Sequence, residues 1–161
     1  HRDTEKVHKM LDPYLNANES DLTAFKNRGG KLLLIHGTAD PIIPCTESIS
    51  YYEKVCNKMG DVGDFFRLFL VPGMAHIGGG PGLQDILFGF PATPRDARHL
   101  GLLALKEWVE TERPPMTLCP VAFAQGDPLA PFRKDGVAWE REIACYESEN
   151  KEENNDPGKL E

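Results

Sequence analysis

The sequence predicts an α/β fold in which helices flank a mostly parallel sheet. Two apolar runs, Leu32 to Ile35 and Phe65 to Val71, are nearly continuous, as expected of strands that are buried on both faces. A helix is expected after each strand, over Glu47 to Met59 and over Arg95 to Thr111. Strands and helices that alternate through short connections favour parallel pairing of the strands.

The elements before the first strand are short. A helix is expected around Glu5 to Leu11, within a stretch that is otherwise polar and weakly patterned. Ser20 can cap a second helix over Asp21 to Arg28, and Gly29 can close it. These segments lead into the first strand and carry no candidate chemistry of their own.

The last helix is indicated by the spacing of its apolar residues, and the loop after the second strand by its glycines. In the last helix, Leu100, Leu103, Ala104 and Trp108 fall on one face, which predicts that this face packs on the sheet. The segment Pro72 to Gly82 cannot be regular structure, because five of its eleven residues are Gly and two are Pro.

Composition divides the 161 residues into four parts. Residues 1–20 are a polar lead-in, 21–113 hold the strands and helices, 114–146 are loop-rich, and 147–161 form an acidic tail that is expected to be disordered. The net charge is −7, and the six acids and two lysines of the tail supply −4 of it. This balance argues against nucleic acid or an anionic membrane as a partner.

Targeting signals are not expected in this chain. It has no run of 18 apolar residues and no signal-peptide pattern at its start. Its first residue is His rather than Met, which suggests a piece of a longer protein.

Four cysteines leave several pairings open. Cys45, Cys56, Cys119 and Cys145 lack the spacing of a zinc site, since the chain has no Cys-x2-Cys pair. Free buried thiols and disulfides both fit this number. Cys119 and Cys145 bracket a helix-poor segment that would gain stability from a covalent link.

The candidate catalytic residues follow the two strands. Asp40 lies five residues after Ile35, and His76 lies five residues after Val71. The carboxyl ends of neighbouring parallel strands are where open α/β sheets build their sites. A carboxylate next to an imidazole is the acid–base pair of a Ser–His–Asp triad, here in the chain order Asp then His. Alternatively, Asp40 is a turn residue before Pro41 and His76 is an ordinary surface histidine.

A nucleophile for such a triad is not found in the chain. No Gly-x-Ser-x-Gly precedes Asp40, and none of the four serines lies between a strand and a helix in that setting: Ser20, Ser48, Ser50 and Ser148. We therefore expect the isolated chain to lack esterase activity and to supply acid and base only when joined to a missing N-terminal half.

Several motifs together resemble the tannase and feruloyl esterase family. They run from Asp21 to Pro44, from Ser50 to Val55, from Phe66 to Gly82 and on to Pro120, so the resemblance covers residues 16–120. The sequence Gly-Gly-Gly-Pro-Gly after His76 is much more selective than a general hydrolase pattern.

The resemblance implies the C-terminal part of an α/β-hydrolase fold, incomplete in this chain, from a serine-type carboxylic ester hydrolase with a large lid domain. It implies esters of phenolic acids, such as gallate or ferulate, as small-molecule aromatic substrates. Asp40 and His76 match the catalytic acid and base of the family. The resemblance also implies a secreted or periplasmic protein. It implies no cofactor in this chain, since the structural calcium of family members belongs to the lid.

The chain departs from the family at one position. Ile77 stands where family members have a cysteine bonded to another cysteine just before the catalytic serine, so the histidine loop must be held by packing and by its glycines. Cys119 and Cys145 resemble the pair that closes the C-terminal segment of the family. His36 resembles a structural residue of such hydrolases. The other histidines are expected to be solvated: His1, His8 and His99.

Two other functions stay open on the sequence alone. One is a different α/β hydrolase, similar to prolyl oligopeptidase or dienelactone hydrolase, whose His-Gly-x-x-Asp segment looks alike. The other is a catalytically inactive or truncated relative that acts as a binding module, which the missing serine and Ile77 favour.

Overall fold

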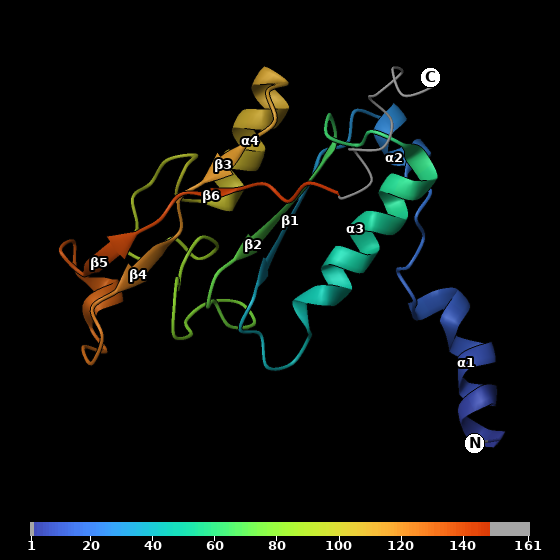
Figure 1. Ribbon diagram of the computed structural model, residues 1–161, viewed down its shortest axis with the longest axis horizontal. Coiled ribbons are helices and arrows are strands. Elements are labelled where there is room, and N and C mark those ends of the chain that lie inside the picture. Colours follow the sequence, from blue (N-terminus) through green and yellow to red (C-terminus); the bar gives the residue numbers. More distant parts are fainter. Residues whose placement is uncertain (1, 149–161) are drawn as a thin grey trace, which may run out of the picture.

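A computed structural model describes residues 2–148 and places two parallel strands at the centre. β1 (Leu32–Gly37) pairs with β2 (Phe66–Val71) in a register that sets Leu32 opposite Phe66 and Gly37 opposite Val71. α3 (Cys45–Met59) covers one face of this pair and α4 (Gly101–Thr111) covers the other (Figure 1). The predicted α/β arrangement with parallel pairing is confirmed.

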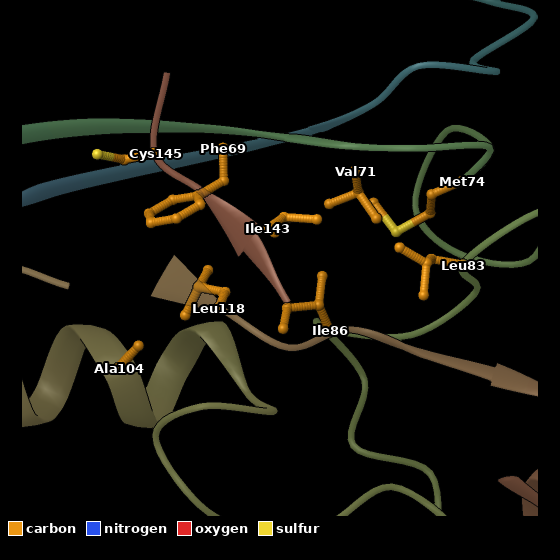
Figure 2. Packing of buried hydrophobic residues seen from close by; sticks show 9 residues of the cluster. All are labelled: Phe69, Val71, Met74, Leu83, Ile86, Ala104, Leu118, Ile143 and Cys145. Carbon is orange, nitrogen blue, oxygen red and sulfur yellow. The ribbon is translucent and has the colours of Figure 1, made fainter. Parts of the chain in front are cut away.

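Burial on both faces explains why the sequence of β2 is apolar except at Arg67. Phe66 and Leu68 point into a cluster with α3, whereas Phe69 and Val71 point into a cluster with α4. Figure 2 shows the second cluster, which lies between β2 and Ala104 of α4. A strand that is buried on both faces needs apolar residues at nearly every position, so the alternating pattern of a half-exposed strand is absent.

The N-terminal helices differ in length from the prediction. α1 (Arg2–Leu15) is longer than expected; it projects away from the rest of the chain, and its side chains are solvated (Figure 1). α2 (Thr23–Asn27) is shorter than expected and is not capped by Ser20. Instead the backbone N–H of Thr23 donates to the Asp21 carboxylate at 3.0 Å, so the helix starts two residues later.

α4 begins at Gly101 rather than at the predicted Arg95, because the residues before it form a turn. The carboxylate of Asp96 accepts hydrogen bonds from the backbone N–H groups of Arg98 and His99 at 2.8 and 3.1 Å. The N–H of Gly101 then donates to the carbonyl of Ile86 at 2.8 Å. Trp108, on the buried face of α4, is fully enclosed as predicted.

The C-terminal segment forms two small antiparallel ladders beside the central sheet (Figure 1). β3 (Thr117–Leu118) pairs with β6 (Ile143–Ala144), and β4 (Val121–Phe123) pairs with β5 (Val137–Glu140). A single 3-10 turn, η1 (Ala130–Phe132), lies between β4 and β5. The division of the chain at residues 20, 113 and 146 stays a prediction, and the tail from residue 149 onward lies outside the described residues.

None of the four cysteines, all of which lie within the described residues, is joined in a disulfide, so the disulfides considered from the sequence do not form in this structure. Cys45 and Cys56 both lie in α3, where eleven residues correspond to about 16 Å along the axis. In the antiparallel pairing of β3 and β6, Leu118 stands opposite Ile143, so Cys119 would stand opposite position 142. Cys145 is three residues away from that position, or about 10 Å along the strand. A disulfide needs Cα atoms within about 7 Å, so the pairing implied by the resemblance is wrong here.

Among the helices of residues 2–148, none has both the length and the apolar character needed to cross a bilayer.

Candidate active site

Asp40 is held in a fixed orientation at the end of β1. Its side chain is only 1% exposed. One carboxylate oxygen, Oδ1, accepts hydrogen bonds from the backbone N–H groups of Ile42 and Ile43 at 2.8 and 3.0 Å. The turn that follows the strand therefore folds back onto the carboxylate and leaves its second oxygen to face another loop.

His76 lies on that loop, directly against the acid. Its Nδ1 is 2.8 Å from Oδ2 of Asp40, although the two residues are 36 positions apart in the sequence. Because a carboxylate only accepts, Nδ1 carries the proton and Nε2 of the neutral ring keeps its lone pair. The His76 side chain is 40% exposed, and within residues 2–148 its Nε2 makes no hydrogen bond. The geometry presents a base that is oriented by a buried acid and open to solvent.

The environment keeps Asp40 ionised. Burial by itself raises the pKa of a carboxyl group. Here the hydrogen bonds from His76, Ile43 and Ile42 outweigh burial, and the pKa of Asp40 is held well below its ordinary value. An ionised carboxylate can stabilise an imidazolium that forms at His76.

His36 is a further member of the site. Its Nε2 lies 3.0 Å from the carbonyl oxygen of Ile43 and 3.3 Å from Oδ2 of Asp40. A carbonyl oxygen only accepts, so Nε2 carries the proton and Nδ1 accepts from the hydroxyl of Ser48 at 2.7 Å. His36 thus approaches the same oxygen of Asp40 as His76 does. The sequence places it on the strand that carries Asp40, but spacing alone does not reveal that contact.

The acid loop and the base loop are joined through their backbones. Thr38 donates its N–H to Val71 at 3.0 Å, and its side-chain oxygen accepts from the N–H of Gly73 at 2.9 Å. Gly37 lies so close to the second loop that a Cβ atom there would stand 2.1 Å from the carbonyl oxygen of Met74. The approach of His76 to Asp40 therefore depends on a residue without a side chain at position 37.

The glycine-rich segment folds onto itself beyond His76. Gly80 has a φ of +103°, and a Cβ atom there would lie 2.3 Å from the carbonyl oxygen of Gly73. The N–H of Ala75 donates to Gly79 at 3.0 Å, which closes the turn. Ile77 is exposed, and the contacts within this loop are backbone hydrogen bonds and close approaches at its glycines.

The chain that carries this pair matches a known family over most of its length. The family model described as tannase and feruloyl esterase matches residues 1–146. The chain belongs to this family. An uncharacterized esterase of Xanthomonas campestris is 35% identical over 152 residues, which cover 84% of the chain and 26% of that protein. Feruloyl esterase B of Aspergillus niger is 39% identical over 106 residues, or 63% of the chain and 20% of that protein.

Solved structures agree with this membership. Feruloyl esterase B from Aspergillus oryzae superposes with a TM-score of 0.75 at 26% identity, over 89% of the chain and 28% of that structure. An esterase from the same organism gives a TM-score of 0.72 at 28% identity, over 90% of the chain and 29% of that structure. The fold is of the α/β-hydrolase type and is a partial domain, since the chain spans about a quarter of the length of these relatives.

Apart from His36, no histidine or serine of the described residues bonds to Asp40 or His76 in this tannase-family chain. Ser48 bonds to His36 rather than to His76, and Ser148 bonds to Glu53. His8 is exposed, as predicted, whereas His1 lies outside the described residues. The expectation that His99 is solvated is wrong, because the turn before α4 folds inward and buries it.

Proposed function

We propose that this chain supplies the acid Asp40 and the base His76 of a serine-type carboxylic ester hydrolase acting on phenolic acid esters. The observation that supports the proposal most directly is the 2.8 Å contact between Nδ1 of His76 and Oδ2 of Asp40, with Nε2 left open. The nucleophilic serine comes from outside this chain.

In this mechanism Nε2 of His76 takes the proton of the serine hydroxyl while the serine oxygen bonds to the ester carbonyl carbon. Asp40 stabilises the resulting imidazolium. The imidazolium then gives its proton to the leaving alcohol as the carbon–oxygen bond of the ester breaks. Water repeats these steps on the acyl-enzyme, releases the acid and restores the serine.

Apolar side chains around the pair favour an ester with an apolar or aromatic acid group. Ile42 and Ile43 follow Asp40, Ile77 follows His76, and all three are exposed. Phe88 is also exposed, and its ring lies against Gly78 of the histidine loop. An aromatic acyl group would bury these side chains when it binds. The relatives named feruloyl esterase agree with this substrate class.

The proposal extends to partner and location. Within the described residues, β1 has no strand on its outer edge, which is the place where the serine-bearing half of the protein would continue the sheet. Secretion to the periplasm or to the outside of the cell is proposed from the family resemblance.

The two alternatives differ in their support. The family match over residues 1–146 goes against a hydrolase of the prolyl oligopeptidase or dienelactone hydrolase kind. An inactive binding module is favoured by Ile77 and by the serines of this chain, none of which bonds to His76.

The test is hydrolysis by the longer protein that carries this chain. Methyl ferulate and methyl gallate are expected to be cleaved, whereas a proline-containing peptide anilide and a dienelactone are not. The 161-residue chain alone is expected to be inactive on all four. Cleavage of only the peptide or the lactone would replace the proposed substrate class, and inactivity on every substrate would favour the binding module.

A further inference from the structure

A second group of chemically active side chains shares no residue with the pair of Asp40 and His76. One donor atom each of His99, Cys119 and Glu140 lies within 4.8 Å of the other two. They come from three segments: the turn before α4, the residue after β3 and the last residue of β5. We propose that this group, called here the His–Cys–Glu cluster, binds one zinc ion per chain and fastens the C-terminal segment to the turn before α4.

The orientation of His99 is the first reason. Its Nδ1 lies 2.7 Å from the carboxylate of Asp96, and its Nε2 lies 3.2 Å from the carboxylate of Glu140. Since Nδ1 faces Asp96, Nε2 is the ring atom that faces Glu140. A proton on Nε2 satisfies this contact, and a bound cation would take the place of that proton between Nε2 and the carboxylate. A carboxylate on the far nitrogen is also the usual support of a metal-binding histidine.

Cys119 completes the set from the other side. Its backbone N–H donates to the carbonyl of Arg98 at 2.7 Å, which holds it next to His99. Three donors around a tetrahedral zinc lie about 3.3 to 3.8 Å apart. Nε2 of His99 lies 3.2 Å from the carboxylate of Glu140, and Sγ of Cys119 lies within 4.8 Å of the donor atoms of both residues.

The chemistry of the donors selects the ion. One nitrogen, one sulfur and one oxygen suit zinc, which accepts all three and leaves its fourth position to water. His99 and Cys119 are buried, whereas the side chain of Glu140 is about half exposed, so the ion has a route in from the Glu140 side. Binding releases the thiol proton of Cys119 to solvent.

Two other uses of Cys119 fit the structure less well. A disulfide to Cys145 is ruled out by the ladder register described above. A nucleophilic role needs access and an acidic thiol, but Cys119 is only 3% exposed, and burial together with Glu140 raises its pKa. Sequence spacing does not reveal the cluster, because its residues lie 20 and 21 positions apart.

The test is titration of the metal-free 161-residue chain with Co²⁺, which replaces zinc and reports on a bound thiolate by a charge-transfer band. One Co²⁺ per chain is expected to produce the band, and Zn²⁺ is expected to remove it by displacement. Zinc is also expected to raise the Tm of the chain, since it binds the folded state. A charge-transfer band that does not form in the unmodified chain overturns the proposal.

Variants separate this site from adventitious binding. Cys119→Ser is expected to abolish the band, and Glu140→Gln, at a half-exposed position that folding tolerates, is expected to weaken binding at least 10-fold. Asp96→Asn should weaken it about 10- to 100-fold, as for other residues that support a metal ligand. Cys145→Ser and Glu142→Gln are the matched controls and should leave the affinity unchanged. A band that survives Cys119→Ser, or an affinity that Glu140→Gln leaves unaltered, contradicts the assignment.

Discussion

At the scale of the residue, Asp40 depends on neighbours that each contribute one contact. Two backbone N–H groups occupy one oxygen, and two histidines approach the other. A buried carboxylate without such partners would be costly, because the charged form loses its hydration. The same contacts fix the direction in which the carboxylate faces His76.

Removal of His36 is predicted to weaken this arrangement. His36→Ala should lower the free energy of unfolding by about 1–3 kcal/mol, because Ser48 and the Ile43 carbonyl lose their partner. Ser48→Ala should cost less, about 1 kcal/mol, because it removes only one hydrogen bond. Urea unfolding of the chain measures both, and equal stability of His36→Ala and the unmodified chain contradicts the role given to His36.

The lowered pKa of Asp40 makes a prediction about acid. Its pKa in the folded chain lies below the ordinary 3.8, so its contribution to stability is fully present well above pH 3.8 and is lost as the pH falls below that value. The Asp40→Asn variant should be less stable near neutral pH and should lack this acid-dependent loss. Urea unfolding between neutral and acidic pH compares the two, with Asp135→Asn at an exposed position as the control. Parallel curves for the unmodified chain and Asp40→Asn contradict the assignment.

At the scale of the element, periodicity and strand ends were enough to predict β1, β2, α3 and α4, together with the loops that carry Asp40 and His76. These features follow from local patterns of burial and from turn-forming residues. The starts of α2 and α4 could not be predicted, because Asp21 and Asp96 each bond to backbone N–H groups that follow them. The burial of His99 and the support from His36 depend on contacts between segments that no local pattern encodes.

Gly37 is the last residue of β1 and lies against the loop that carries His76. Its replacement is predicted to lower the stability of the chain strongly. In Gly37→Ala the new Cβ atom would lie 2.1 Å from the Met74 carbonyl oxygen, so the two loops must separate. We expect a loss of stability of about 2–4 kcal/mol, measured by urea unfolding. Gly63→Ala is the matched control, because its Cβ would meet only movable side-chain atoms of Arg67 and Asp61 at 3.3 Å or more. A loss no larger than that of the control contradicts the close-approach argument.

At the scale of the whole molecule, the described residues form a narrow sheet whose outer edge on β1 is unpaired. The apolar side chains of α1 add to this open surface: Val7, Met10, Leu11, Tyr14 and Leu15. Unpaired strand edges and exposed apolar faces promote association between copies of a chain.

The 161-residue chain is therefore predicted to self-associate in solution. Sedimentation velocity over a range of protein concentrations should show a mean mass that rises with concentration. Met10→Lys, on the apolar face of α1, is expected to reduce association. Asp3→Lys, at an exposed polar position of the same helix, is expected to leave association unchanged. A monodisperse monomer at every concentration contradicts the prediction.

In the proposed mechanism Asp40 and His76 act as one acid–base unit. The unit is tested by kcat for methyl ferulate or methyl gallate in the longer protein that carries this chain, compared with its His76→Ala and Asp40→Asn variants. We predict losses in kcat of at least about 10⁴-fold for His76→Ala and about 10³- to 10⁴-fold for Asp40→Asn. His8→Ala and Asp12→Asn alter an exposed pair of the same composition and should leave kcat unchanged. Folded variants of His76 and Asp40 that keep the kcat of the parent would contradict the account.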